Sequence, residues 1–235
     1  MIYINGDSHS AGAELVNDYC FAADDRRFIA WGSRAHPEAI PHTYGYKIAQ
    51  ALNQPFFMDA ESASSNARIL RTTRKFLDET KDKSKLFVII GWASWDREEW
   101  EYQDGYIQIT ASGTDSVPES MEGEYKEWAI NQTEEEFYRK QQLWREKIAQ
   151  FSKELDDQNI KHIFFPIHKY QRYLLEQGYQ TVNGGQHFGI DAHTAWYKHL
   201  LPKVQEQYQI KTGLTQPTKR SIITQVKQEF KGLKR

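Results

Sequence analysis

The sequence predicts an α/β protein of three layers (α/β/α), in which helices cover both faces of a central parallel sheet. Four short apolar runs resemble buried strands: residues 1–6, Pro55–Met58, Leu86–Ile90 and His162–Ile167. Continuous apolar runs, without alternation of polar and apolar residues, are typical of parallel strands buried on both faces. Helical patterns lie between them, and strands that alternate with helices favour right-handed crossovers in one sheet.

Four segments show the periodicity of helices that bury one face: Thr43–Leu52, Asn66–Thr80, Thr133–Leu155 and Asp191–Tyr208. The third is the clearest, because its apolar residues recur at intervals of three, four and seven positions. Thr133 and Glu136 have the spacing of a capping box at its start. Pro202 lies inside the fourth segment and predicts that this helix is kinked or divided.

The length of 235 residues favours a single domain, which we place at residues 1–208. An insertion at 98–131 breaks the alternation of strands and helices. Its glycines, its proline and the alternating segment Tyr106–Thr110 predict a hairpin and a loop near the functional cleft. Residues 209–235 form a basic C-terminal tail. From Lys211 onward there are seven basic residues and one acidic residue, whereas the other 210 residues carry a net charge of −8.

The tail has apolar residues between its charges, in positions compatible with one stripe of a helix. A basic amphipathic segment of this kind packs on its own protein, associates with a second copy or binds a partner. We therefore expect self-association or partner binding through the tail.

Composition excludes several classes of protein. Mean hydropathy is −0.76, and no apolar run approaches the roughly 18 residues of a membrane span. Cys20 is the single cysteine, so the chain is not a disulfide-stapled scaffold. A net charge of −2 gives no case for nucleic acid as a partner. The first residues show no basic and apolar leader, so we expect a cytoplasmic protein.

The strongest local motif is Gly6-Asp-Ser-His-Ser-Ala-Gly12, directly after the first predicted strand. Open parallel sheets place their ligands at the carboxyl ends of the strands, and Ser8 would expose its hydroxyl there. Backbone N–H groups beside it could stabilise an oxyanion. The alternative is a turn followed by a helix N-cap, for which Asp and Ser are also favoured.

A serine nucleophile needs a base within hydrogen-bond reach and a third group that orients the base. We select His193 as the base and Asp191, two positions earlier, as the orienting group. The alternatives are that Asp191 caps a helix and His193 lies at the surface, or that His187 or His199 faces Ser8 instead. His187, Asp191 and His193 could also hold a metal, but without a nearby cysteine or a second cluster we predict none.

The first motif together with Asp191-Ala-His193 resembles the sequence blocks of the SGNH (GDSL) hydrolases. The resemblance covers the order of the two motifs and their separation of about 185 residues. It implies a flavodoxin-like fold with Ser8 as nucleophile, His193 as base, Asp191 as the orienting residue, and no cofactor. A weaker resemblance, to uncharacterised SGNH-like proteins of marine phages, covers most of residues 1–205 and leaves out the tail.

The middle blocks of the family are matched less closely. Ala63 stands where the family has the glycine whose N–H enters the oxyanion hole, and alanine lacks glycine's freedom of φ. The segment Gly91–Arg97, after the third strand, lacks the family's asparagine, a second oxyanion donor. Losing such a donor typically costs about 10²–10³ in rate. We assign the donors to Ser8, Ala63 and Asn66, with a plain N-cap as the alternative role of Asn66.

Aromatic residues gather between residues 91 and 130, and Trp92 and Trp95 directly follow the third predicted strand. We predict that Trp92, Trp95 and Arg97 border the cleft and bind the substrate. The alternative is that the large side chains only anchor the insertion on the body of the protein.

Together these features predict a serine esterase that removes an O-acetyl group from a carbohydrate, with a small-molecule or polysaccharide ester as its partner. The choice of carbohydrate rests on the family resemblance and on the aromatic residues. The competing prediction is an SGNH-fold protein with little or no activity that has a binding or structural role, for example in a phage virion. The absent asparagine and the basic tail favour that second prediction.

Overall fold

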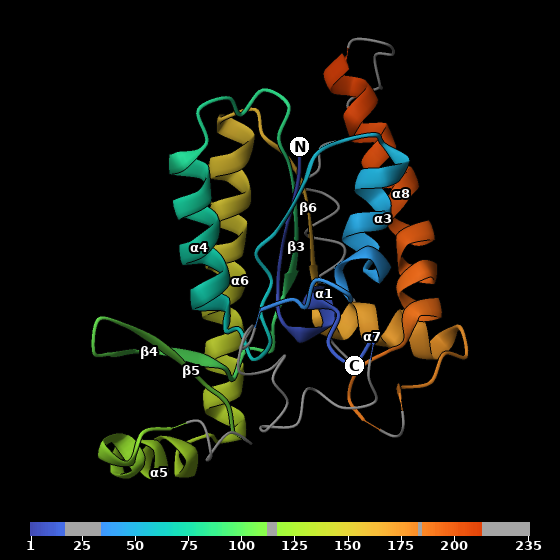
Figure 1. The fold of residues 1–235 in the computed structure, drawn as a ribbon. Helices are drawn as coiled ribbons and strands as arrows, with labels where there is room; N and C mark the ends of the chain where they lie inside the picture. The colour runs from blue at the N-terminus through green and yellow to red at the C-terminus, as the bar shows by residue number, and fades with distance from the viewer. Residues whose placement is uncertain (17–33, 112–116, 183–184, 213–235) are drawn as a thin grey trace.

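The computed structural model describes residues 1–16, 34–111, 117–182 and 185–212. In these residues the chain is an α/β protein whose central sheet has four parallel strands, with helices on both faces (Figure 1). The strand order is β2-β1-β3-β6, formed by Phe56–Met58, Ile2–Asn5, Phe87–Trp92 and Lys161–Pro166. The predicted α/β class with a central parallel sheet is therefore confirmed, and each of the four predicted strands occurs.

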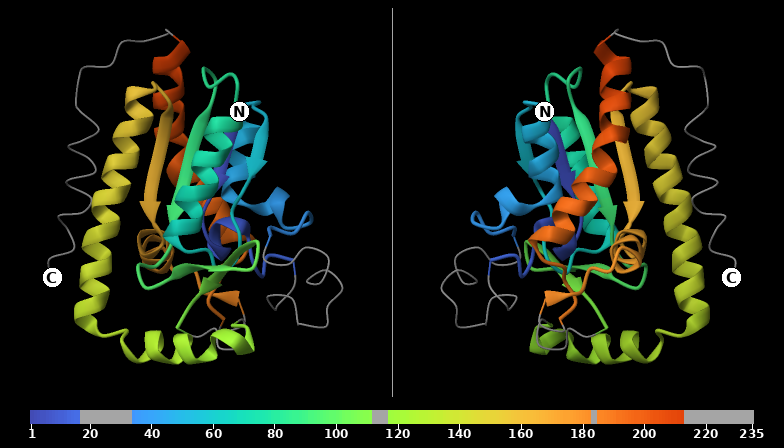
Figure 2. Two further views of the ribbon diagram at one scale, coloured as in Figure 1. Left: turned by 90° about the vertical axis from the view of Figure 1, so that its left-hand side faces the viewer. Right: turned by 90° about the vertical axis from the view of Figure 1, so that its right-hand side faces the viewer.

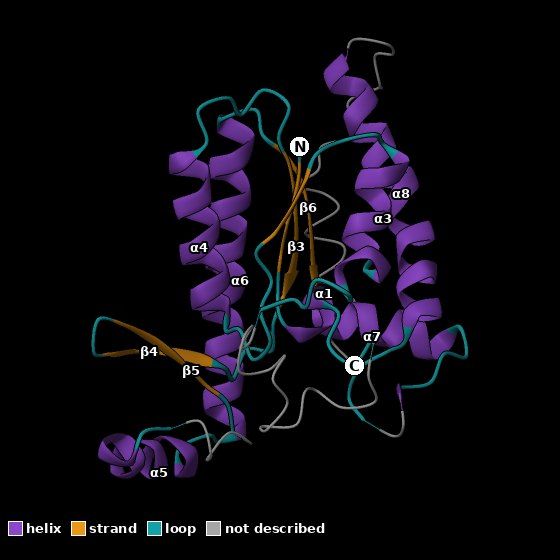
Figure 3. Cartoon of the chain, in the orientation of Figure 1, coloured by secondary structure: helices purple, strands orange, loops and turns teal. Residues whose placement is uncertain are grey.

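The register of the parallel sheet places the carboxyl ends of its neighbouring strands side by side. Ile2 pairs with Phe56 on one side and with Phe87 on the other, and the β3–β6 ladder ends where Trp92 pairs with Pro166. Because all these strands run in one direction, their carboxyl ends meet at one edge, which lies at the lower end of the sheet in Figure 3. The segment that follows β1, and with it Ser8, lies at this edge.

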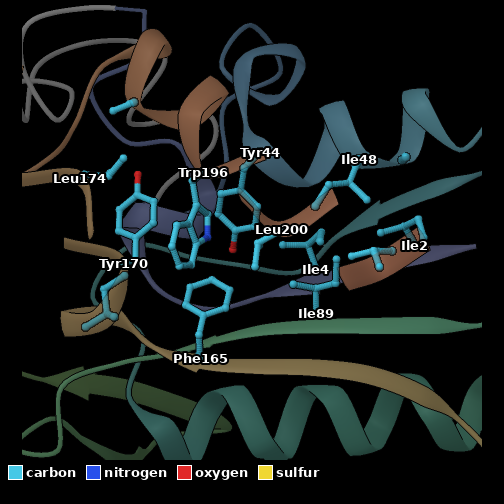
Figure 4. Close-up of a cluster of buried hydrophobic side chains, with 14 of the residues drawn as sticks. Ile2, Ile4, Tyr44, Ile48, Ile89, Phe165, Tyr170, Leu174, Trp196 and Leu200 are labelled. Carbon is cyan, nitrogen blue, oxygen red and sulfur yellow. The ribbon is translucent and has the colours of Figure 1, made fainter. Parts of the chain in front are cut away.

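One face of the sheet is covered by α3 (Tyr44–Ala51), α7 (Ile167–Glu176) and α8 (Ile190–Thr212). Their core cluster, drawn in Figure 4, packs Ile4 and Ile89 of the sheet beside Trp196 and Leu200 of α8. The α8 helix continues through Pro202, so the expectation of a divided helix is wrong. Buried side chains on both sides of the proline, Leu200 and Val204, hold the two halves against the same core.

The other face is covered by α4 (Asn66–Glu79) and α6 (Glu134–Asp157). The predicted stripe of α6 is buried at Trp144, Ile148, Phe151 and Leu155. Thr133 is its N-cap, and its hydroxyl accepts from the Glu136 N–H at 3.2 Å. The Glu136 side chain bonds to Arg139 instead of reaching back, so the capping box forms only in part.

The predicted insertion contains a β-hairpin, as expected, but also a helix in place of a loop. The hairpin pairs β4 (Glu98–Tyr102) with β5 (Gly105–Ile109), and α5 (Glu122–Ile130) follows after a short 3₁₀ turn at Glu119–Met121. Figures 1 and 2 show the hairpin and α5 at the end of the molecule toward which the strands point. A further 3₁₀ turn, Ile40–His42, precedes α3. The basic tail falls almost wholly outside the described residues.

Candidate active site

The turn after β1 positions Ser8. Asp7 is the N-cap of the short helix α1 (Ser8–Ala11), and its Oδ1 accepts from the His9 N–H at 3.1 Å. Gly12 ends the helix with φ of 79°, a left-handed conformation that glycine adopts without strain, and its N–H donates to the Ser8 carbonyl at 3.0 Å. Ser8 is therefore the first residue of α1, held at the carboxyl edge of the sheet.

Close packing behind this turn fixes its position. Ser10 fits between Gly6 and Gly91, because a Cβ on either glycine would lie less than 3.0 Å from the Ser10 hydroxyl. The Tyr44 hydroxyl donates to Ser10 Oγ at 2.8 Å. The Ser8 turn, residues Gly6–Gly12, is thus held against both β3 and α3, which leaves little freedom for the backbone of Ser8.

A serine, a histidine and a carboxylate form one chain of contacts in the structure. His187 Nε2 lies 2.7 Å from Ser8 Oγ, and His187 Nδ1 lies 3.2 Å from Glu14 Oε1. With its Nδ1–H donating to Glu14, the imidazole presents Nε2 as the acceptor for the Ser8 hydroxyl. This is the arrangement that activates a serine nucleophile.

Glu14 reaches His187 from an unusual backbone position. Its φ is 65°, in the left-handed region, where a residue with a side chain is strained. Its second oxygen, Oε2, is buried without a hydrogen-bond partner among the described residues. A Cβ on Gly185 would lie 3.0 Å from that oxygen, so the glycine leaves the room that the carboxylate occupies.

The predicted base and orienting residue are corrected by this geometry. His193 is 1% exposed inside the core, and its Nδ1 accepts from the Tyr44 N–H at 3.3 Å. Asp191 is exposed in the first turn of α8, where a negative charge stabilises the helix dipole. Residues two apart on a helix do not face each other. The structure therefore brings neither residue of this pair to Ser8, and His187 takes the place predicted for His193.

Burial makes His193 a structural residue with a consequence for stability. Burial, with smaller effects of the charges near it, lowers the pKa of His193 to about 3. In the unfolded chain a histidine binds a proton below about pH 6.5, whereas folded His193 stays neutral. The stability that this residue contributes is therefore complete above pH 6.5 and is lost as the pH falls toward 3, by up to about 1.4 kcal/mol per pH unit.

We expect His193→Asn, which keeps an acceptor near the Tyr44 N–H, to reduce that dependence. Between pH 6.5 and 5, the free energy of unfolding should fall less steeply with decreasing pH in the variant than in the wild type. The difference between the two slopes should correspond to the uptake of up to one proton on unfolding. Urea unfolding at several pH values in this range measures both slopes. Equal slopes would show that His193 does not stay neutral in the folded protein.

His9 is a second buried imidazole beside the candidate base. Its ring centroid lies 4.8 Å from that of His187, and its Nε2 lies 3.1 Å from the amide nitrogen of Gln171. Burial lowers the pKa of His9 to about 4, although Asp7 acts in the opposite direction. His9 is therefore neutral at neutral pH and adds no charge that would oppose protonation of His187.

The three predicted oxyanion donors have different surroundings. The N–H groups of Ser8 and Ala63 donate to none of the described residues. Ala63 has φ of 61°, so the alanine adopts the left-handed conformation that glycine would take without strain. Asn66 is different: its Nδ2 donates to the carbonyls of Ala93 and Ser94 at 3.2 and 3.5 Å. Its amide is engaged, and the assignment of Asn66 as an oxyanion donor is corrected.

The alternative N-cap role of Asn66 is also wrong. Asn66 is the first residue of α4, and the N-cap is Ser65, whose hydroxyl accepts from the Arg68 N–H at 3.2 Å. The fully buried Asn66 instead ties the start of α4 to the segment after β3. Its role in the structure is to hold these two segments together.

The predicted substrate-binding tryptophans lie in the core. Trp92 is 1% exposed and Trp95 is 3% exposed, and both pack with Phe151 and Leu155 of α6. Trp92 is the last residue of β3 and Trp95 lies three residues beyond it, and at this burial neither indole offers a face to a substrate. Arg97, with about 20% of its side chain exposed, lies beside the Ser8 turn and forms an ion pair with Asp7 at 3.2 Å.

Two aromatic residues of the insertion, Trp100 and Trp128, line a separate hollow of about 640 Å³. The two indoles pack edge to face, and Lys140 and Glu98, which also line the hollow, form an ion pair. None of Ser8, His187 and Glu14 lines this hollow. The tryptophans at 92–128 thus divide between the core, which holds Trp92 and Trp95, and this hollow.

In the described part of the chain, no group of three or more histidine, cysteine, aspartate or glutamate side chains gathers in an arrangement that could hold a metal ion. No helix in the same residues combines the length and apolar character that a membrane crossing requires.

Comparison with known proteins assigns no family, because no family model and no curated protein matches the chain. The geometry of the site is therefore what points to a function.

Proposed function

We propose that the chain is a serine esterase of the SGNH type in which Ser8, His187 and Glu14 form the catalytic triad. The observation that carries the proposal is the 2.7 Å contact between Ser8 Oγ and His187 Nε2, with Glu14 on the opposite ring nitrogen. A serine alone is a weak nucleophile, and this pairing is the standard means of activating it. The resemblance of the Gly6–Gly12 motif to the SGNH hydrolases supports the same assignment.

The proposed reaction has two stages. Ser8 Oγ attacks the ester carbonyl while His187 Nε2 takes the hydroxyl proton, and a tetrahedral oxyanion forms. The C–O bond to the alcohol then breaks, His187 returns the proton to the leaving oxygen, and an acyl group remains on Ser8. Water attacks that acyl group with His187 again as base, which releases the acid and restores Ser8. Glu14 stabilises the imidazolium in both stages.

The oxyanion is held, in this proposal, by the N–H groups of Ser8 and Ala63. Both are free of other hydrogen bonds among the described residues. Donors aimed at the developing charge are usually the largest single contribution to catalysis of acyl transfer. No step of the mechanism requires a cofactor.

The proposed substrate is an O-acetyl ester on a carbohydrate. The family resemblance is what supports this choice, because Trp92 and Trp95 are buried and give no aromatic wall for a sugar. The competing proposal, a weakly active or inactive protein with a binding or structural role, is favoured by the engaged amide of Asn66, which leaves two backbone donors.

A fluorophosphonate probe tests the proposal directly, because it reacts with an activated serine. We expect the adduct on Ser8, located by mass spectrometry of the digested protein, and p-nitrophenyl acetate turnover that Ser8→Ala removes. Ser152 is a matched comparison, since its Oγ also lies 2.7 Å from a histidine, His162 Nε2, whose other nitrogen contacts only a backbone carbonyl. Labelling should be lost in Ser8→Ala and kept in Ser152→Ala. An unlabelled Ser8 without turnover would favour the binding protein.

A further inference from the structure

Arg97 joins the two segments that carry the free N–H groups of the site. Its Nη1 lies 3.2 Å from Asp7 Oδ2 and 3.4 Å from the carbonyl oxygen of Ser64. Asp7 directly precedes Ser8, and Ser64 directly follows Ala63. One nitrogen with two hydrogens therefore links the residue before the first donor to the residue after the second.

Asp7 connects Arg97 to the Ser8 turn. The carboxylate is fully buried, and its two oxygens have different partners: Oδ1 caps α1 at the His9 N–H, and Oδ2 receives Arg97. Because a buried carboxylate needs a compensating charge, the position of Asp7 depends on the position of the guanidinium. A shift of Arg97 would thus move the start of α1, where Ser8 lies.

The other side of the link is a loop with a strained backbone. Ala63 is left-handed, and the loop contacts the Ser8 turn by a long backbone hydrogen bond of 3.3 Å, from Glu61 N–H to the Gly6 carbonyl. A strained conformation persists only where neighbouring contacts hold it. The Arg97 contact to Ser64 is one of those contacts, next to the strained residue.

We propose that Arg97 is a positioning residue of the oxyanion hole: it holds the Ser8 turn and the Ala63 loop at the separation at which both N–H groups reach one oxygen. This inference rests on the proposed esterase function and extends it. It gives Arg97 a role on the enzyme's own backbone rather than on the substrate. A lysine, with a single nitrogen on a flexible stem, lacks the planar guanidinium that keeps these contacts in a fixed geometry.

Arg97→Lys is the first test, with p-nitrophenyl acetate as substrate and rates normalised to sites titrated with the fluorophosphonate. We expect kcat to fall about 10- to 100-fold, because a displacement of about 1 Å in a catalytic group has effects of this size. KM should change less than about threefold. The shape of the pH–rate profile should stay the same, since His187 and Glu14 are untouched. In Arg97→Ala, added methylguanidinium should restore part of kcat.

Arg74→Lys is the matched control, because Arg74 also makes a paired contact, to both Glu154 oxygens, but ties α4 to α6. It should leave kcat unchanged. Where Arg97 variants fold poorly, the double variant Asp7→Asn/Arg97→Gln removes both charges of the pair together and should show the same loss of kcat. A wild-type kcat per titrated site in folded Arg97→Lys would overturn the inference and leave the esterase standing. Turnover that does not depend on Ser8 would instead overturn the esterase.

Discussion

Replacing His187 with alanine should lower kcat/KM for p-nitrophenyl acetate by a factor of about 10⁴–10⁶, as loss of the base does in serine hydrolases. Without the imidazole, Ser8 has no acceptor for its proton, and the leaving alcohol has no donor. The residual rate should resemble that of Ser8→Ala, because the two residues act as a unit. Steady-state kinetics on both variants, with circular dichroism as a check on folding, make the comparison.

The control for this experiment is His193→Asn, at the histidine that the sequence motif favours. His193 contacts Tyr44 in the core and not Ser8, so a folded His193→Asn protein should keep kcat/KM within about tenfold of the wild type. The triad assignment would be wrong if folded His193→Asn lost its activity while folded His187→Ala retained it.

Replacing Glu14 with glutamine should lower kcat by about 10⁴, the size of effect that follows when the acid of a triad becomes an amide. Glu14 Oε1 accepts from His187 Nδ1, and the glutamine amide can instead donate to that nitrogen. Donation from the glutamine would move the ring proton to Nε2, which could then no longer accept from Ser8. Single-turnover acylation and kcat with p-nitrophenyl acetate measure the loss.

Asp191→Asn is the matched control for Glu14, because it makes the equivalent change at the carboxylate favoured by sequence spacing. Asp191 is exposed on α8, and its substitution should leave kcat unchanged. Glu14→Asp should recover part of the activity lost in Glu14→Gln, since it restores an acceptor at a shorter reach. The reverse pattern, in which Asp191→Asn is inactive and Glu14→Gln is active, would refute the proposed third residue.

The sheet and the position of Ser8 could be predicted from sequence, because the residues that determine each of them are close together in the chain. Each strand of the central sheet is a continuous apolar run, which only a strand buried on both faces requires. Ser8 follows the first of these runs within three residues, so its place at the carboxyl edge follows from the fold class alone.

The histidine that contacts Ser8 could not be identified from sequence, because a spacing of two residues does not determine where each side chain points. Asp191 and His193 lie on α8, where a separation of two residues turns one side chain toward solvent and the other into the core. The contacts that matter are long in sequence: Ser8 and His187 are 179 positions apart. Glu14 carries no pattern that marks it, since its reach depends on a left-handed backbone and on the room left by Gly185.

The burial of Trp92 and Trp95 could not be predicted from sequence for a related reason. A position after a strand predicts an edge of the sheet but not the face toward which a side chain turns. Trp92 is still part of β3, and both indoles turn to the face covered by α6. The amphipathic stripe of α6 could be recognised from sequence. Neither the sequence of α6 nor that of residues 92–95 shows that the two segments pack together.

The separation of Ser8 from His187 in the sequence also determines when, during synthesis of the chain, the two side chains can meet. Ser8 is synthesised before His187, whose imidazole follows 179 positions later, roughly 10–40 s at ordinary rates of translation. In a nascent chain Ser8 therefore lacks the contact with His187 until α7 has been made and His187 has docked against α1. Chains truncated before His187 should be unreactive toward the probe, so that labelling of Ser8 also reports how much of the domain has been synthesised and assembled.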